Sequence, residues 1–521
     1  MGMGAADADE YDVLVVGGGP VGTHIAYLAG LAGKRIGIVE PRGRLLAAPT
    51  GWVSKVFREA GRELGSKDAS HRADWQRVVD EFLLPTAERA FALTDRTVEQ
   101  LKAVSGTCSV TIIKGKAEFS GPMQLTVTDE SAETASPPVL LRASSIFLAI
   151  GSLANRLPSL PWSDPLADGF LFDSDTIMNV GRLPHHVAIQ GAGVIGFEYA
   201  SIFRRLGADV TIFFRESAPL DVGIGIDSSV MKAVLKRMTK VGITVLCEDG
   251  DIESIDLPPQ KHGMGRITLA KSGRVIECDA FMSAIGRHGN ASSLNLGAGG
   301  LAAPVRGNFV QVDPDSMRAR TAQGDADFSM PVYAIGDCCL GSRITGMLLS
   351  SGQAHAEIAA NHAFGLDEIH ADGRLKRSST TGFVFSEVEY PEHHAVALWT
   401  DPTIAYAGLS EQAAVAKLGA ERVGTVTVHF TDTVKACVRP RGKDEFLKLV
   451  YKKDGGTLLG VCIFGSDASE IVQNVCSSIN RGDTLWQVAR TVQPAVTYQE
   501  SLRTAAFRAI HSIQLEQEQD A

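Results

Sequence analysis

The glycine pattern G-x-G-x-x-G occurs twice in this chain, and it constrains the fold more than any other feature. Each copy follows a short apolar stretch, residues 13–16 or 187–190, and opens a helical pattern. That strand–turn–helix context is typical of a Rossmann dinucleotide site. Two copies predict an α/β fold in which electrons pass between two dinucleotides. The glycines are Gly17, Gly19 and Gly22 in the first copy and Gly191, Gly193 and Gly196 in the second.

The strand that follows each glycine pattern ends differently in the two copies. In the first, residues 35–39 end at Glu40, whose carboxylate can accept hydrogen bonds from both hydroxyls of an adenosine ribose. In the second, residues 209–213 lead through Phe214 to Arg215, a cation suited to a 2′-phosphate. The first copy therefore predicts FAD or NAD, and the second favours NADP(H). A solvated surface role for Arg215 stays open, because Glu216 is adjacent.

The tripeptide Ala-Ile-Gly ends three apolar strands, at Gly151, Gly286 and Gly336. Glycine there lets the backbone turn close to a ligand. Asp337 follows the third copy and can accept hydrogen bonds from the ribityl hydroxyls of a flavin, a role compatible with capping the next helix. These repeats predict that the chain leaves one nucleotide domain, enters a second, and returns.

This layout predicts that the chain divides into four stretches. Residues 72–105, in the N-terminal stretch, have helical spacing and predict one long helix. After residue 370 the pattern changes to strands and helices without a fingerprint, which indicates a separate α+β domain. The expected division is 1–157 for the first part of the FAD-binding domain, 158–286 for the NAD(P)-binding domain, 287–370 for the second, central part of the FAD-binding domain, and 371–521 for the C-terminal domain.

Composition excludes several function classes. The formal charge of −10 over 521 residues disfavours nucleic acid as a partner, and no apolar run is long enough to cross a bilayer. The first ten residues are small and acidic, unlike a signal or transit peptide, so a cytoplasmic location is expected, with a cleaved organelle presequence left open. The eight cysteines have no metal-ligand spacing, which predicts no metal site and fits a reducing compartment.

Taken together, these motifs resemble the flavoprotein disulfide reductase family with two dinucleotide sites. Glutathione reductase, dihydrolipoamide dehydrogenase and mercuric reductase are members. Within the family the chain is most similar to the soluble pyridine nucleotide transhydrogenase branch. The stretches that carry the resemblance are 172–177, 191–203, 286–290, 333–337 and 468–472, and Gly289 replaces a proline common in other branches.

The resemblance implies FAD at the first fingerprint and a nicotinamide, NADP or NAD, at the second. It implies a homodimer built through the C-terminal domain. It also implies that Gly151, Gly286 and Arg287 line the cofactors, and that Lys55 forms an ion pair with Glu198 on the nicotinamide side of the flavin. The alternative to this ion pair is that Lys55 and Glu198 lie on separate helix surfaces and never meet.

Two parts of disulfide chemistry are missing. Family members carry C-x-x-x-x-C after the position of Glu40, but residues 41–55 contain no cysteine. The C-terminal His-Pro-Thr…Glu is replaced by residues 493–500, which keep Glu500 as a candidate catalytic group but have no histidine. Without a thiolate pair and a proton shuttle, electrons cannot be passed to a disulfide.

The predicted function is therefore hydride transfer between NADPH and NAD+ through bound FAD, without a redox disulfide. Two alternatives stay open. One is an NAD(P)H-dependent reductase or diaphorase with a quinone or another acceptor, for which Trp52 could stack the substrate. The other is a non-catalytic FAD-bearing subunit of a larger assembly, with residues 386–394 as a docking surface.

Overall fold

A computed structural model describes residues 9–46, 52–65, 71–105, 109–130, 137–217, 220, 225–324, 327–344, 346–364, 393–439 and 442–520. The chain forms two compact units, and each collects three separate stretches of sequence. Unit 1 comprises Met1–Gly51, Leu84–Ala154 and Arg287–Tyr390. Unit 2 comprises Trp52–Leu83, Asn155–Gly286 and Pro391–Ala521. The domain boundaries expected at 157, 286 and 370 stay predictions.

Unit 1 is built on a parallel sheet in which β1 is central. Strand β1 pairs in parallel with β2 and β6, β2 continues to β3, and β18 pairs with β6. An antiparallel pair, β4 and β5, extends the other edge from β6. The strands are β1 (Asp9–Val16), β2 (Ile36–Glu40), β3 (Val110–Lys114), β4 (Lys116–Gly121), β5 (Gln124–Thr128), β6 (Val139–Leu148) and β18 (Val332–Ala334).

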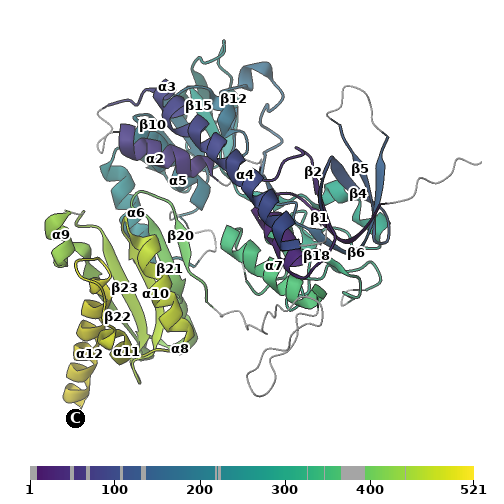
Figure 1. Ribbon diagram of the computed structural model, residues 1–521. Helices are drawn as coiled ribbons and strands as arrows, with labels where there is room; N and C mark the ends of the chain where they lie inside the picture. Colours follow the sequence, from purple (N-terminus) through teal and green to yellow (C-terminus); the bar gives the residue numbers. More distant parts are fainter. Residues whose placement is uncertain are drawn as a thin grey trace, which may run out of the picture. The chain divides into compact units, whose positions relative to one another are not determined.

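Buried, uninterrupted apolar residues explain why β1 is central. Val13, Leu14, Val15 and Val16 are all at most 5% exposed, as expected of a strand covered on both faces. The helices of this unit are α1 (Pro20–Leu31), α4 (Leu84–Ser105) and α7 (Leu349–Phe364), and α1 packs against both of the others (Figure 1). Short strands complete the unit: β7 (Ser152–Ala154), β16 (Arg287–Gly289), β17 (Val310–Gln311) and β19 (Cys339–Leu340).

The middle stretch of unit 2 contains a second parallel sheet, in the order β11-β10-β9-β15-β8. Its helices are α5 (Val194–Leu206), which follows β9, and α6 (Ser228–Lys240). A separate antiparallel sheet, β12-β13-β14, is inserted before β15. The strands are β8 (Leu171–Phe172), β9 (His186–Gln190), β10 (Asp209–Phe213), β11 (Thr244–Leu246), β12 (Ile252–Asp256), β13 (Gly265–Leu269), β14 (Val275–Cys278) and β15 (Ala280–Ser283).

The last stretch of unit 2 folds around an antiparallel sheet, β20-β21-β24-β23-β22. Helices α10 and α12 pack on this sheet and share one core with its strands (Figure 1). The strands are β20 (Val396–Leu398), β21 (Ile404–Gly408), β22 (Val423–His429), β23 (Phe446–Lys452) and β24 (Leu458–Phe464). The helices are α8 (Glu411–Leu418), α9 (Val434–Val438), α10 (Ala468–Asn480), α11 (Leu485–Arg490) and α12 (Glu500–Asp520).

The long helix expected over residues 72–105 differs from the structure. Helix α3 (Trp75–Arg77) is followed by a π-helical segment, Val78–Leu83, before α4 begins at Leu84. Pro85 explains the change, because its ring would clash with the carbonyl four residues earlier in a regular α-helix. The wider π turn avoids that clash. In unit 2, α2 (Val53–Leu64) packs against this segment and against α5.

Among the helices of the described residues, none combines the length and the apolar character that crossing a membrane requires.

Candidate functional site

The first glycine fingerprint joins β1 to α1 in unit 1. Gly17 has φ +109°, and a Cβ on Gly22 would lie 1.9 Å from the carbonyl oxygen of Gly17, so side chains are excluded at both positions. A Cβ on Gly19 would meet no heavy atom within 4 Å. The turn is therefore closely packed beneath and open beside Gly19, where α1 begins. A pyrophosphate fits such a place, because free N–H groups and the helix dipole favour an anion.

Glu40 stands where β2 ends and is tied to this turn. Its Oε2 accepts a hydrogen bond of 2.8 Å from the N–H of Gly18, and its Oε1 accepts one of 3.2 Å from Arg42. The carboxylate is thereby fixed beside the glycine turn. Together, the open turn and the fixed acid fit the pyrophosphate and ribose of a dinucleotide such as FAD.

The second fingerprint, between β9 and α5 in unit 2, repeats this geometry. Gly191 has φ +129°, and a Cβ there would lie 2.2 Å from the carbonyl oxygen of Ala284. A Cβ on Gly196 would lie 2.6 Å from the oxygen of Gly191, whereas one on Gly193 would meet nothing within 4 Å. As in the first fingerprint, the first glycine has a positive φ, the third has no space for a Cβ, and the second is open. Each unit thus has one such glycine turn, which we call its dinucleotide cradle.

Arg215 follows the strand next to this second cradle. The N–H of Gly191 donates to the carbonyl of Phe213 at 2.9 Å, which joins the fingerprint to the end of β10. Arg215 lines an open pocket there, and its Nε lies 3.8 Å from Oδ1 of Asp251. Both side chains are 70% exposed. Sequence reasoning missed Asp251, because its sequence distance from the fingerprint carries no signal.

Asp337 and Arg287 meet at Ser152 in unit 1. Ser152 Oγ donates to Oδ2 of Asp337 at 3.1 Å, and the guanidinium of Arg287 donates to the Oγ and the carbonyl of Ser152. Burial raises the pKa of Asp337, although the bond from Ser152 and the charge of Arg287 oppose this shift. Gly151 precedes Ser152 and has φ +67°. Sequence reasoning missed Ser152, although its place directly after a turn glycine could have revealed it.

Gly286 lies just after β15, the strand that pairs with β9 next to the second cradle. It has φ +100°, and its carbonyl accepts a hydrogen bond of 2.9 Å from Asn155, also in unit 2. A Cβ at this position would approach the amide of Asn155 to 3.2 Å.

Lys55 and Glu198 come together within unit 2. Lys55 lies on α2 and Glu198 on α5, and their Nζ and Oε2 atoms are 3.5 Å apart. Glu198 is 6% exposed, and its Oε1 accepts a hydrogen bond of 2.9 Å from the main-chain N–H of Trp399. The ring of Trp399 in turn covers the guanidinium of Arg58, with 4.3 Å from Cζ to the ring centroid. Trp399 holds the carboxylate through its backbone, so its residue type gave the sequence analysis no signal.

Glu500 has a local structural contact. It is the first residue of α12, and its Oε2 accepts a hydrogen bond of 3.1 Å from the N–H of Thr497. A carboxylate at a helix N-terminus is stabilising without any catalytic task. Its catalytic role stays a prediction.

The adjacent thiols of Cys338 and Cys339 are free in the structure. Cys338 Sγ donates to the carbonyl of Leu148, and Cys339 Sγ to that of Gly336. Burial raises the pKa of Cys338 to about 12 and that of Cys339 well above its ordinary value. Both thiols therefore stay protonated at neutral pH and are poor nucleophiles. Of the segment that replaces the cysteine pair, residues 47–51 lie outside the described residues, as do 386–392 of the expected docking surface.

Two similar glycine cradles on two parallel sheets define a class, the α/β proteins with two dinucleotide sites. Comparison with known families is more specific. Residues 11–363 match the model described as pyridine nucleotide-disulphide oxidoreductase, and residues 394–506 match the dimerisation domain of the same family. The chain belongs to the pyridine nucleotide-disulphide oxidoreductase family. This confirms the expected fold class and the family resemblance.

Individual relatives agree with this assignment. The chain is 26% identical over 513 residues to the soluble pyridine nucleotide transhydrogenase of Colwellia psychrerythraea, covering 97% of this chain and 99% of the relative. A protein of the same name from Mycobacterium bovis is also 26% identical, over 518 residues, with 97% and 98% covered.

Solved structures show the same fold. The Cu(II) complex of the HOCl-induced flavoprotein disulfide reductase RclA from Escherichia coli has a TM-score of 0.74 at 19% identity, over 96% of this chain and 99% of that one. LpdA from Mycobacterium tuberculosis has a TM-score of 0.74 at 20% identity, with the same coverage. This protein is thus a flavoprotein oxidoreductase, with the cofactors FAD and NAD(P) of its family.

Proposed function

We propose that the protein transfers hydride between NADPH and NAD+ through bound FAD, without a redox disulfide. The observation that carries the proposal is the pairing of two complete glycine cradles with a segment, residues 41–55, that contains no cysteine. Relatives named soluble pyridine nucleotide transhydrogenase, similar over almost the whole chain, support it.

In this proposal Gly17, Gly19, Gly22 and Glu40 hold FAD, with Gly151, Asp337 and Arg287 on its flavin half. Bound FAD supplies a ring that takes up a hydride from one nicotinamide and gives it to another. Asp337 would accept a hydrogen bond from a hydroxyl of the cofactor through Oδ1, since Ser152 donates to its Oδ2. These residues bind and orient, and the cofactor carries the chemistry.

Lys55 and Glu198 are the proposed catalytic pair. Glu198 keeps a fixed position because the N–H of Trp399 holds one of its oxygens. The other oxygen faces the ammonium group of Lys55, so the carboxylate keeps that cation in place. A fixed charged pair acts on the electron distribution of a neighbouring ring without moving during the reaction.

Both nicotinamides use the second cradle in turn, held by Gly191, Gly193, Gly196 and Gly286. Arg215 is the proposed contact for the 2′-phosphate of NADPH. NAD+ lacks that phosphate, so a single site that serves both nucleotides cannot depend on one strong phosphate contact. The exposed position of Arg215 fits this requirement.

We further propose a homodimer formed through residues 394–506, the part that matches the dimerisation domain, and a cytoplasmic location. Transhydrogenase activity, measured in the separated fractions of the native cell, would test the location.

Anaerobic titration of the purified protein tests the function. We expect NADPH to bleach the flavin absorbance near 450 nm, and NAD+ to restore it. Failure of both NADPH and NADH to bleach the flavin contradicts the proposal and favours a non-catalytic subunit. Bleaching by NADPH, followed by recovery with a quinone but not with NAD+, contradicts it in favour of a reductase.

The variant Glu198→Gln tests the catalytic pair. Its amide oxygen can still accept the bond from Trp399, while the charge that faces Lys55 is lost. We expect flavin reduction by NADPH to slow about tenfold or more, with flavin content unchanged. Glu63→Gln, an exposed carboxylate on α2, the helix that carries Lys55, is the control. Equal rates in Glu198→Gln and the wild type would remove Glu198 from the mechanism.

A further inference from the structure

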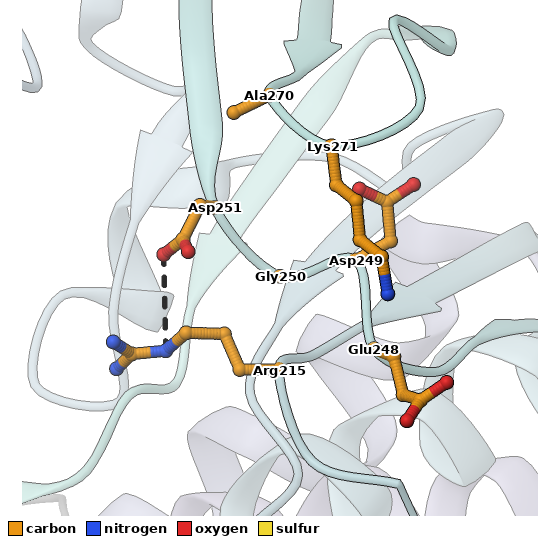
Figure 2. Close-up of a pocket in the computed structure, with 7 residues that line it drawn as sticks. All are labelled: Arg215, Glu248, Asp249, Gly250, Asp251, Ala270 and Lys271. Carbon is orange, nitrogen blue, oxygen red and sulfur yellow. Dashed lines mark ion pairs between the residues drawn. The ribbon is translucent and has the colours of Figure 1, made fainter.

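An open pocket lies at the end of β10, beside the second glycine cradle. Its volume is about 460 Å³ and its walls come from three segments of unit 2. Arg215 follows β10, Glu248 to Asp251 connect β11 to β12, and Ala270 and Lys271 begin the turn after β13 (Figure 2). The pocket therefore lies where the strand order places the adenosine end of a bound dinucleotide.

Main-chain contacts fix Asp251 beside Arg215. The N–H of Asp249 donates to the carbonyl of Phe214 at 3.0 Å, which attaches the connecting segment to the residue before Arg215. A Cβ on Gly250 would lie 2.3 Å from the backbone nitrogen of Arg215, so only glycine allows this close passage. The carbonyl of Asp251 accepts a hydrogen bond of 2.9 Å from Ala270.

A buried side chain supports the same segment from below. Gln190, the last residue of β9 and only 5% exposed, donates through Nε2 to the carbonyl of Gly250 at 2.7 Å. Since Gln190 directly precedes the glycine fingerprint, the cradle and the acidic segment are joined by a short buried bond. The backbone of Asp251 is thus held in place by the fold, while its side chain is 70% exposed.

The pocket has mixed charge with an acidic excess. Arg215 and Lys271 are its two cations, and Glu248, Asp249 and Asp251 are its three carboxylates. Figure 2 shows Nε of Arg215 facing the carboxylate of Asp251, whereas the ammonium of Lys271 lies on the other side of Gly250. A 2′-phosphate that enters here meets a guanidinium that already has a carboxylate partner.

We propose that Asp251 determines the nucleotide choice of this site by competing with the 2′-phosphate for Arg215. The inference rests on the proposed function for the identity of the ligand. With NADP(H), Arg215 exchanges Asp251 for the phosphate; with NAD(H), it keeps Asp251. The pocket therefore accepts both nucleotides and does not select strongly for the phosphorylated one.

The weakness of the existing pair makes the exchange feasible. Arg215 and Asp251 are both largely exposed and 3.8 Å apart, and exposed pairs contribute little. A phosphate dianion offers the planar guanidinium two parallel hydrogen bonds and is the stronger partner.

Binding of fragments measures this competition without hydride transfer. Adenosine 2′,5′-bisphosphate and AMP, titrated calorimetrically into the FAD-loaded protein, represent the adenosine ends of NADP(H) and NAD(H). We expect their dissociation constants in the wild type to differ by less than about tenfold. Asp251→Asn should tighten the bisphosphate about three- to tenfold and leave AMP within about twofold. Glu253→Gln, an exposed acid two residues along, should change neither.

A double-mutant cycle tests whether the effect passes through Arg215. Arg215→Ala should weaken the bisphosphate, and adding Asp251→Asn to it should recover much less than the single substitution gains. An undiminished gain in the Arg215→Ala background would overturn the inference, because Asp251 would then act on the phosphate directly. Equal effects of Asp251→Asn and Glu253→Gln would overturn it in favour of a general field.

The two proposals fail separately. If NADPH and NAD+ exchange no hydride but Asp251→Asn still tightens the bisphosphate selectively, the proposed function falls and Asp251 keeps its role. If hydride exchange proceeds and none of the fragments responds to Asp251→Asn, the role of Asp251 falls and the function stands.

Discussion

Gly22 and Gly19 are only three residues apart, yet a methyl group has opposite consequences at the two positions. At Gly22 it would lie 1.9 Å from a backbone oxygen, which cannot move without distorting β1 and the turn. At Gly19 it would meet no protein atom, and the backbone there has φ −70°, which alanine adopts freely. The first glycine serves the fold, and the second leaves space for a ligand.

We therefore predict that Gly22→Ala destabilises the protein, whereas Gly19→Ala lowers only its flavin content. The steric conflict in Gly22→Ala should reduce the free energy of unfolding by more than about 2 kcal/mol. In Gly19→Ala the flavin-free protein should unfold as the wild type does, while the ratio of flavin to protein absorbance falls. Differential scanning calorimetry and absorbance at 450 nm measure the two quantities. Equal flavin content in Gly19→Ala and the wild type would contradict the second half.

Single residues also show what sequence can predict. The fingerprint glycines and Glu40 can be found from the sequence, because the glycine turn, the strand end and the spacing between them are local features. The proximity of Lys55 and Glu198 was implied only by family resemblance, since they lie on different helices far apart in sequence. Trp399 and Asp251 carry no comparable signal, because tertiary packing alone brings their polar groups to the sites.

Among the elements, helix α6 depends on a buried ionic cluster. Its N-cap residue Asp227 accepts hydrogen bonds from Ser229 and, at 2.9 and 3.0 Å, from the ammonium of Lys448 on β23. Glu411, on α8, pairs with the same ammonium at 2.5 Å. Asp227 and Lys448 have side chains 0% and 6% exposed. The cluster thus joins the start of α6 to the C-terminal sheet within unit 2.

Removal of one partner should be costly here. Lys448→Met keeps the volume of the side chain but leaves the carboxylate of Asp227 buried without its cation. We predict a loss of about 3–5 kcal/mol in the free energy of unfolding, measured by urea denaturation. Adding Asp227→Asn should restore at least half of it. Lys452→Met, on the same strand and 3.8 Å from a mostly exposed Asp454, should cost less than about 1 kcal/mol. Similar losses in the two lysine variants would contradict this role.

The pH range of the cluster follows from its pKa shifts. Burial alone would raise the pKa of Asp227, but bonds from Ser229, Lys448 and Glu411 outweigh it, and the pKa is lowered. Burial would lower the pKa of Lys448, but its carboxylate partners raise it. Ionised Asp227 therefore stabilises the fold fully above the ordinary aspartate pKa of about 3.9, and this stability is lost as pH falls below it. Charged Lys448 stabilises the fold fully below the ordinary lysine pKa of about 10.4, and this stability is lost as pH rises above it. The full effect of Lys448→Met should therefore appear between these limits.

At the scale of the whole molecule, sequence patterns indicate which elements exist better than how separated stretches combine. The two strand–turn–helix units and a C-terminal domain of mixed strands and helices follow from apolar runs and glycine turns. Residues 52–83, however, belong to unit 2 although their neighbours on both sides belong to unit 1. No change in composition marks where the chain passes from one unit to the other, because this depends on the packing of α2 against α5, more than a hundred residues away.

The C-terminal part of unit 2 presents apolar side chains that a lone chain would leave in water. Val492 is 91% exposed, and Trp486 and Phe507 are 49% and 48% exposed. All three lie within or directly beside the segment 394–506 that matches the dimerisation domain. Several large exposed apolar residues in one such segment are typical of a surface that another chain covers.

We predict that the wild type sediments as a dimer at micromolar concentration and that Val492→Asp combined with Phe507→Glu shifts it to the monomer. Each substitution places a charge where dimer formation would bury it, and an uncompensated buried charge is strongly unfavourable. Val275→Asp, on β14 and 51% exposed, is the control, because it adds a charge to an apolar surface position outside the dimerisation segment. A wild type that sediments as a monomer would contradict the predicted dimer. A double variant that stays dimeric would place the interface elsewhere.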